Sequence, residues 1–177
     1  MNLAVWVERH ARRLPGAPAL ADGERLHASW AEFAARAAGA AACLRDEFGL
    51  SPGDRAAILM RNRPEYLEAL IAIWHAGLVA VPVNARLHRD EIAYILEHSR
   101  SAVVVTDADH AGDVESLVGT VASLGRPWWR RASGGTGSRR RRQRHSSCGS
   151  RRTRPGFSTP AVPRAGPRGP RSPTATS

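Results

Sequence analysis

Apolar residues along this chain form two kinds of pattern, short continuous runs and longer stretches with helical spacing. The continuous runs are bounded by turns or charged residues, which is typical of buried strands; they cover Ala56–Met60, Val79–Val83 and Ala102–Thr106. Apolar residues at helical spacing predict helices over Pro64–His75, Arg89–His98 and Asp113–Leu124. Strands that alternate with helices predict an α/β fold, with a parallel sheet flanked by helices.

Further elements are predicted before the first of these strands. Residues 2–13 fit an amphipathic helix, with one face made of Leu3, Trp6, Val7 and His10. A hairpin is predicted where two short segments flank the polar turn Asp22-Gly23-Glu24, namely Pro18–Ala21 and Arg25–Ala28. Ser29 and Glu32 have the spacing of a capping box, so a long helix is expected to begin there. Gly49 is expected to end this helix by adopting a left-handed backbone conformation.

The periodicity also predicts which side chains are buried. In the helix from Pro64 the expected buried stripe is Leu67, Leu70, Ile71, Trp74 and Leu78. In the helix from Asp113 it is Val114, Leu117, Val118, Val121 and Leu124. Pro82 has no backbone N–H, so the strand from Val79 is expected to stop or bulge there.

The chain changes composition near Gly125. Residues 1–125 hold all sixteen acidic residues and twelve arginines, a net charge of −4, whereas residues 126–177 hold fourteen arginines and no acid, a net charge of +14. Six residue types (Arg, Ser, Gly, Pro, Thr and Ala) make up 45 of those last 52 residues, a composition that cannot build a core. We therefore predict one domain over residues 1–125 and a disordered basic tail over residues 126–177.

Cysteines and apolar segments indicate the compartment. Cys43 and Cys148 do not suggest a disulfide framework or a zinc site, and Cys43 is expected to be a small core residue. The short apolar run Leu3–Val7 is followed by Glu8 and does not fit a signal peptide. No apolar run approaches the length of a membrane span. A cytoplasmic protein is the expectation.

Several polar residues are candidate site residues because of their positions on a predicted helix or after predicted strands. His75 follows Trp74 on a predicted helix and is expected to be structural rather than a ligand. Asn84 and Arg86 follow a strand end, where ligands bind in open α/β sheets, and Asp107 and Asp109 follow another, where loop capping is favoured over metal binding. No catalytic, cofactor-binding or metal-binding residue is assigned.

Seven segments, in their order and spacing, resemble the start of the AMP-forming acyl-CoA synthetases, which are adenylate-forming ligases. They are Ser29–Phe33, Gly53–Met60, Asn62–Glu65, Trp74–Gly77, Val81–Arg86, Glu91–Leu96 and Thr106-Asp107. The resemblance covers roughly residues 1–125 and implies the N-terminal subdomain of such a ligase. It also implies a two-step reaction in which a carboxylate and ATP form an acyl-adenylate and CoA then displaces AMP. The implied small molecules are a carboxylic or fatty acid, ATP, Mg²⁺ and CoA.

The family's catalytic elements are expected beyond this region: a phosphate loop rich in Gly, Ser and Thr, ribose-binding acids and a catalytic lysine. All 26 basic residues of this chain are arginine, so it has no lysine. Ser133–Gly137 superficially resembles a phosphate loop, but neither a strand before it nor a helix after it is predicted. The hypothesis is a truncated synthetase that is inactive as this chain, with no cofactor assigned to its residues.

The tail fits a one-base frameshift near Pro127. Tryptophan has the single codon TGG, so Trp128-Trp129 is encoded by TGGTGG. If each tail codon begins one base late, the original frame starts one base earlier and reads GTG GTG, or Val-Val, when the Pro127 codon ends in G. With each tail codon shifted in the same way, Pro160 through Gly169 permit Thr-Ser-Gly-Thr-Thr-Gly-Arg-Pro-Lys-Gly. That sequence resembles the family's phosphate loop. Because codons are degenerate, the amino acids show only that the shifted frame is compatible with a phosphate loop at each position.

Two other functions stay open. An adenylation domain acting on amino or aryl acids would share the same N-terminal pattern. A basic-tailed polyanion-binding protein would use Arg139–Arg142 and Arg144, although the tail aromatics are not interleaved for base stacking and no specific nucleic acid is expected. The sheet is also expected to leave apolar surface exposed and to limit solubility.

Overall fold

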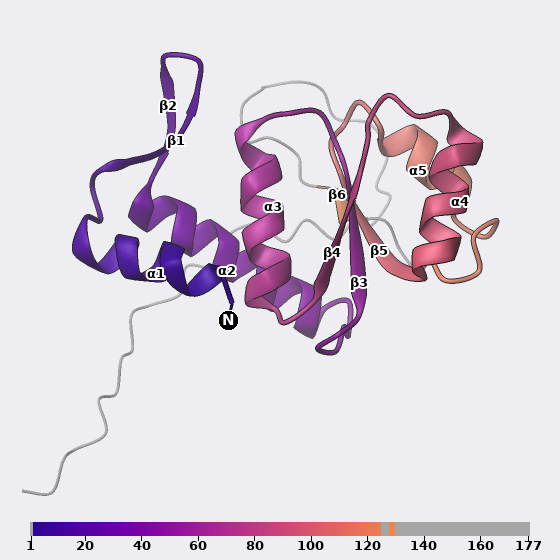
Figure 1. The fold of residues 1–177 in the computed structure, drawn as a ribbon, viewed down its shortest axis with the longest axis horizontal. Coiled ribbons are helices and arrows are strands. Elements are labelled where there is room, and N and C mark those ends of the chain that lie inside the picture. The colour runs from indigo at the N-terminus through magenta and orange to yellow at the C-terminus, as the bar shows by residue number, and fades with distance from the viewer. Residues whose placement is uncertain (1, 125–127, 130–177) are drawn as a thin grey trace, which may run out of the picture.

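The computed structural model describes residues 2–124 and 128–129. In chain order its elements are α1 (Ala4–Arg13), β1 (Pro18–Asp22), β2 (Arg25–Ser29), α2 (Trp30–Asp46), β3 (Arg55–Leu59), α3 (Pro64–His75), β4 (Val79–Val83), α4 (Arg89–Ser99), β5 (Ser101–Thr106), α5 (Ala111–Leu117) and β6 (Trp128–Trp129). The strands β4-β3-β5-β6 form one sheet in that order, and β1-β2 form a separate pair (Figure 1).

The larger sheet is parallel and buried on both faces. β3 pairs in parallel with β4 on one side and β5 on the other. Alternate strand residues such as Ile58 and Val105 pack with α2 and α3, and the residues between them, such as Leu59 and Val104, pack with α4 and α5. Figure 1 shows these two helical layers on opposite sides of the sheet. The predicted α/β fold is confirmed.

The N-terminal elements form a smaller module beside this sandwich. β1 and β2 pair antiparallel around Gly23, which has φ +58°, so the predicted hairpin is confirmed. The module has its own small core of Val7, Leu20, Ala28 and Phe33. On α1 the buried residues are Ala4 and Val7, whereas Leu3 and Trp6 are half exposed. The predicted face of this helix was therefore wrong in those two positions.

Helix boundaries follow local chemistry closely. The Ser29 hydroxyl accepts from the Glu32 N–H at 3.4 Å, and the Glu32 carboxylate accepts from the Ser29 N–H at 2.9 Å, so the capping box is confirmed. Pro64 occupies the first turn of α3, where its missing N–H costs nothing. Gly49 and Gly77 follow α2 and α3 with φ +66° and +78°, conformations that glycine adopts without strain.

The predicted buried stripe of α3 was wrong in most positions. The buried residues of α3 are Pro64, Glu68, Ala69, Ala72 and Ile73, and Leu78 beyond its end is also buried. Leu67 is 44% exposed, and Leu70, Ile71 and Trp74 are only partly buried. Small side chains lie innermost because α3 packs closely on both α2 and the sheet, which moves the larger residues to the edges of the contact.

Two further predictions fail for backbone reasons. The helix expected over Asp113–Leu124 ends at Leu117, because the chain turns at Gly119 with φ +88°; Val118 is exposed, although Val121 and Leu124 are still buried. β4 neither stops nor bulges at Pro82, which pairs with Ile58 in unbroken register. The Val79 N–H donates to the Asp54 carbonyl, so the N–H groups of Val79 and every second residue after it are directed toward β3. The nitrogen of Pro82 is on the other side of β4, where none of the described strands needs an N–H donor.

Part of the segment expected to be disordered is ordered. Trp128 and Trp129 form β6, parallel to β5 beside Val105 and Thr106. The predictions for Ser133–Gly137, Arg139–Arg142, Arg144 and Cys148 lie outside the described residues. Cys43 is buried, as expected. None of the helices in the described part of the chain is long and apolar enough to cross a membrane.

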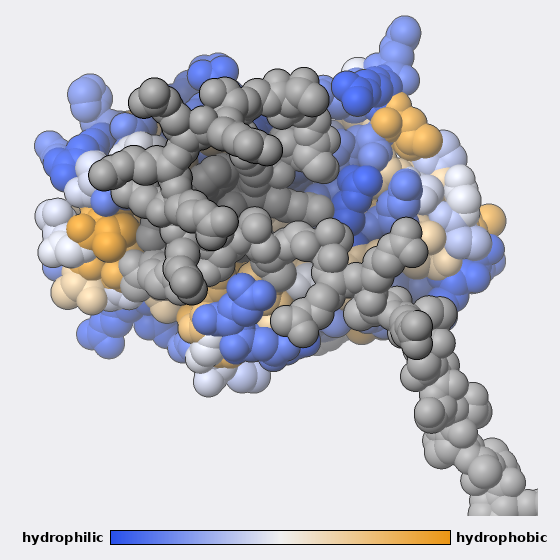
Figure 2. Space-filling model, turned by 180° about the vertical axis from the view of Figure 1, so that it is seen from behind, coloured by the Kyte–Doolittle hydropathy of each residue, from blue (hydrophilic) through white to orange (hydrophobic). Residues whose placement is uncertain are grey.

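Exposed apolar side chains are spread over the described surface. Nine large ones are exposed, among them Trp6, Leu14, Leu26, Val79 and Tyr94. In the view from behind, the visible hydrophobic side chains form separate patches between hydrophilic ones (Figure 2). The expected limit on solubility stays a prediction.

Candidate functional site at the carboxyl ends of the strands

The carboxyl ends of β3, β4 and β5 lie at one edge of the sheet, because these strands are parallel. A groove of about 1000 Å³ opens there. Its polar lining comes from the segments that follow each strand: Arg61 and Asn62 after β3, Asn84 and Arg86 after β4, and His110 after β5. Ligands of open α/β sheets bind at this edge, and a lining with two arginines suits an anionic group.

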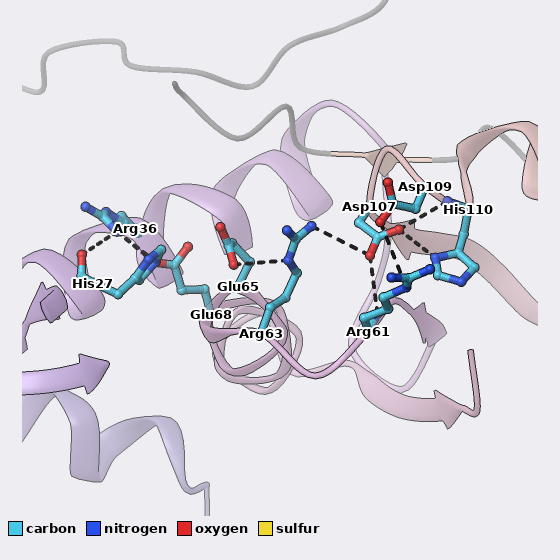
Figure 3. Close-up of polar contacts among 9 residues, drawn as sticks. All are labelled: His27, Arg36, Arg61, Arg63, Glu65, Glu68, Asp107, Asp109 and His110. Carbon is cyan, nitrogen blue, oxygen red and sulfur yellow. Dashed lines mark hydrogen bonds and ion pairs between the residues drawn. The ribbon is translucent and has the colours of Figure 1, made fainter. Parts of the chain in front are cut away.

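Asp107 ties two of these segments together. Its side chain is 3% exposed, and its Oδ1 accepts from the His110 N–H at 3.1 Å and lies 2.6 Å from His110 Nδ1. Its Oδ2 accepts from the Arg61 N–H at 3.3 Å and lies 3.7 Å from Arg63 Nη1 (Figure 3). The expectation that Asp107 caps its loop is confirmed, and the same carboxylate also holds the β3 loop.

Asp107 is ionised because its hydrogen bonds outweigh its burial. Burial by itself would raise the pKa of Asp107, but the His110 side chain and the Arg61 and His110 N–H groups lower it further than burial raises it, and the net pKa lies below its ordinary value. An ionised carboxylate only accepts hydrogen bonds, so His110 Nδ1 is the donor.

The other candidates of this edge have weaker contacts. Asp109 lies 3.9 Å from Arg61 Nε, and both side chains are more than half exposed. Asn84 Oδ1 accepts from the Arg86 N–H at 3.0 Å, which fixes the turn after β4, while the Arg86 side chain is exposed at the groove. Asn84, Arg86 and the Asp107 segment are therefore brought together, as their positions after strands indicated.

His75 lies at the other end of the molecule. It is the last residue of α3, which runs back toward the amino ends of the strands. Its Nε2 lies 2.9 Å from Glu8 Oε1, so it links α3 to α1. Its buried Nδ1 has no hydrogen-bond partner among the described residues. The structural role expected for His75 is consistent with this link.

A second polar cluster was missed by the sequence analysis. Glu68 on α3 is 3% exposed, and its Oε1 lies 3.0 Å from both Arg36 Nη1 on α2 and His27 Nε2 on β2 (Figure 3). Helical spacing predicts which positions face a core but gives no sign that a carboxylate takes one of them. The only available signal was the charge itself at a position next to the apolar stripe.

Comparisons with known proteins identify the family. The AMP-binding enzyme model matches residues 7–149, which extends past the predicted boundary at residue 125. A feruloyl-CoA synthase from Amycolatopsis sp is 40% identical over 116 residues, which make up 66% of this chain and 23% of that protein. An L-proline--[L-prolyl-carrier protein] ligase from Streptomyces coelicolor is 34% identical over 122 residues, 66% of this chain and 22% of that protein.

A solved structure agrees in fold. The inhibitor-bound N-terminal domain of FACL13 from Mycobacterium tuberculosis superposes with a TM-score of 0.67 at 26% identity, covering 72% of this chain and 33% of that one. The chain thus spans less than a quarter of the curated relatives that it matches. From the match over most of its length, the chain belongs to the AMP-binding enzyme family, whose members similar to it include acyl-CoA ligases.

Proposed function

We propose that this chain is the N-terminal scaffold of an AMP-forming acyl-CoA ligase and that it does not complete the reaction by itself. In the reaction of the family, a carboxylate attacks the α-phosphorus of ATP, pyrophosphate leaves, and the CoA thiol then displaces AMP from the acyl-adenylate. The scaffold would support one edge of the site in which these substrates meet.

The observation that carries the proposal is the family match combined with what the matched sequence lacks. The match to the family covers most of the chain, yet the chain has no lysine, and the sequence predicts neither a strand before nor a helix after its phosphate-loop-like segment Ser133–Gly137. A phosphate loop works by presenting backbone N–H groups to phosphate oxygens. Residues 160–169 contain three prolines, at 160, 163 and 167, and Pro170 follows directly; proline has no N–H to present.

The groove supports a contact with an anionic substrate. Arg61 and Arg86 line it together with the amides of Asn62 and Asn84, and the family's ATP and CoA both carry several negative charges. Across the described residues, no three His, Cys, Asp or Glu side chains converge as metal ligands. We further propose a cytoplasmic location, because ATP and CoA are cytoplasmic metabolites.

An ATP–pyrophosphate exchange assay on the purified full chain tests this proposal. The substrate panel should include fatty acids, aryl acids such as ferulate, and amino acids. The chain is similar to a medium-chain-fatty-acid--CoA ligase, a feruloyl-CoA synthase and an L-proline--[L-prolyl-carrier protein] ligase. We expect no exchange above the protein-free control. Robust exchange with any acid would overturn the claim that the chain is inactive by itself. The matched control is the same gene with one base removed or added near codon 127 and its downstream sequence included.

Two alternatives have their own tests. The similarity to an L-proline--[L-prolyl-carrier protein] ligase supports an adenylation domain for amino acids, and exchange by the frame-corrected control with amino acids alone would favour it. The +14 charge of residues 126–177 supports polyanion binding. Binding to nucleic acid that is lost on deletion of residues 126–177 but resists high salt would favour a selected function over incidental charge.

A further inference from the structure

The hairpin β1–β2 has little apolar contact of its own to hold it. Each strand buries one side chain, Leu20 on β1 and Ala28 on β2. The small core to which they belong has four buried residues, whereas the two cores on the faces of the sheet have twelve and ten. An isolated two-stranded hairpin is marginally stable in water, so contacts outside the hairpin decide whether it stays docked.

One buried carboxylate supplies such a contact. His27, on β2, reaches Glu68 Oε1 on α3, and Arg36 on α2 reaches the same oxygen, each at 3.0 Å. Arg36 Nη1 also lies 3.2 Å from His27 Nε2. His27 and Arg36 lie 41 and 32 residues before Glu68, so all three meet only when the hairpin is docked on both helices (Figure 3).

Burial makes this contact decisive for docking. The Glu68 side chain is almost fully buried, and a buried carboxylate is tolerated only when its hydrogen bonds are satisfied. When the hairpin leaves, His27 leaves with it, and Glu68 loses its 3.0 Å contact with the His27 ring. The docked position is thereby favoured over displaced ones, in which the buried carboxylate would have lost its contact with the hairpin.

We propose that His27, Arg36 and Glu68 form a latch that holds the hairpin β1–β2 on α2 and α3, and that the hairpin opens as one unit when the latch is released. Opening leaves the parallel sheet intact, because neither core on the faces of the sheet includes a described residue of β1 or β2. The latch is thus a conformational device separate from the groove at the strand ends.

Native-state hydrogen exchange of the full chain at increasing urea concentration tests the latch. In the wild-type chain, the amides of β1 and β2 should open together, at lower free energy and with weaker urea dependence than those of β3 and β5. In Glu68→Gln the amide oxygen can still accept but the charge is lost, so the opening constant of the hairpin should rise about tenfold, as expected when a charged acceptor becomes neutral. Its weak urea dependence should be unchanged.

The matched control is Glu65→Gln, on the same helix, where Glu65 pairs with Arg63 at 3.6 Å outside the latch. Its hairpin opening should match the wild type. If Glu68→Gln does not fold, His27→Ala decides, because it releases the latch from the hairpin side and leaves Glu68 with Arg36. The proposal is overturned if the hairpin opens only with the whole domain, or if its opening is the same in the latch variants as in the control.

Discussion

Glu68 and Asp107 are two carboxylates with the same 3% exposure, and each contacts a histidine and an arginine. They differ in what holds them. Asp107 accepts from two backbone N–H groups in the loops after β3 and β5, whereas Glu68 contacts the His27 and Arg36 side chains on β2 and α2. The difference teaches that a carboxylate bound to backbone fixes the shape of loops, while one bound to remote side chains fixes how whole elements dock.

The largest effect is expected for Glu68→Ala. It leaves Arg36 and His27 without their shared acceptor in a partly buried site, so we expect the free energy of unfolding to fall by about 2–4 kcal/mol. Urea denaturation followed by circular dichroism measures it. Glu65→Ala is the control, since its partly exposed ion pair is worth at most about 1 kcal/mol. A Glu68 variant no less stable than the control would remove the distinction between the two carboxylates.

A smaller effect, with a characteristic pH dependence, is expected for Asp107→Asn. At neutral pH we expect a loss of about 1–3 kcal/mol, because a charged acceptor of several N–H groups is replaced by a neutral amide. The pKa of Asp107 is lowered in the folded state, so its contribution is fully present above the unfolded pKa of about 4 and is lost as the pH falls through the lower folded pKa.

Urea denaturation of the wild type and Asp107→Asn at several pH values between 7 and 3 measures this dependence. The gap in unfolding free energy should be constant above about pH 5 and should close on acidification below about pH 4. A gap that stays constant over the whole range would mean that the charge of Asp107 does not contribute, and that only the shape of its side chain matters.

The smallest effect is expected for Arg63→Ala. Arg63 Nη1 is 3.7 Å from Asp107, and its side chain is 39% exposed, so solvent screens this ion pair. We expect the unfolding free energy to fall by at most about 1 kcal/mol. This variant separates the backbone hydrogen bonds of Asp107 from its ion pair. A loss as large as that of Asp107→Asn would show that the ion pair, rather than the backbone, holds the two loops.

The sequence predicted the sheet well because each strand is a continuous apolar run between turns. The segments of β3, β4 and β5 and the full extent of α3 followed from this pattern with shifts of one residue at most. The position of Asp107 after a strand also indicated its role, because loop capping is a local property. Such features depend on neighbours in sequence, which periodicity and capping rules describe.

Features that depend on tertiary packing could not be predicted in this way. Leu67 looked buried by spacing, but the close approach of α3 to α2 favours Ala69 and Ala72 at the contact. Glu68 is buried because His27 and Arg36 arrive from elements 41 and 32 residues away. Pro82 is tolerated inside β4 because that strand is at the edge of the described sheet, and strand order is not written in any single segment.

The central claim is that residues 1–125 are a ligase scaffold whose catalytic continuation is encoded in another reading frame. The nucleotide sequence of the gene from codon 120 onward, read in all three frames, tests it most directly. We predict that one shifted frame encodes Val-Val at codons 128 and 129 and Thr-Ser-Gly-Thr-Thr-Gly-Arg-Pro-Lys-Gly in place of residues 160–169. If neither shifted frame encodes a phosphate loop there, the claim is contradicted.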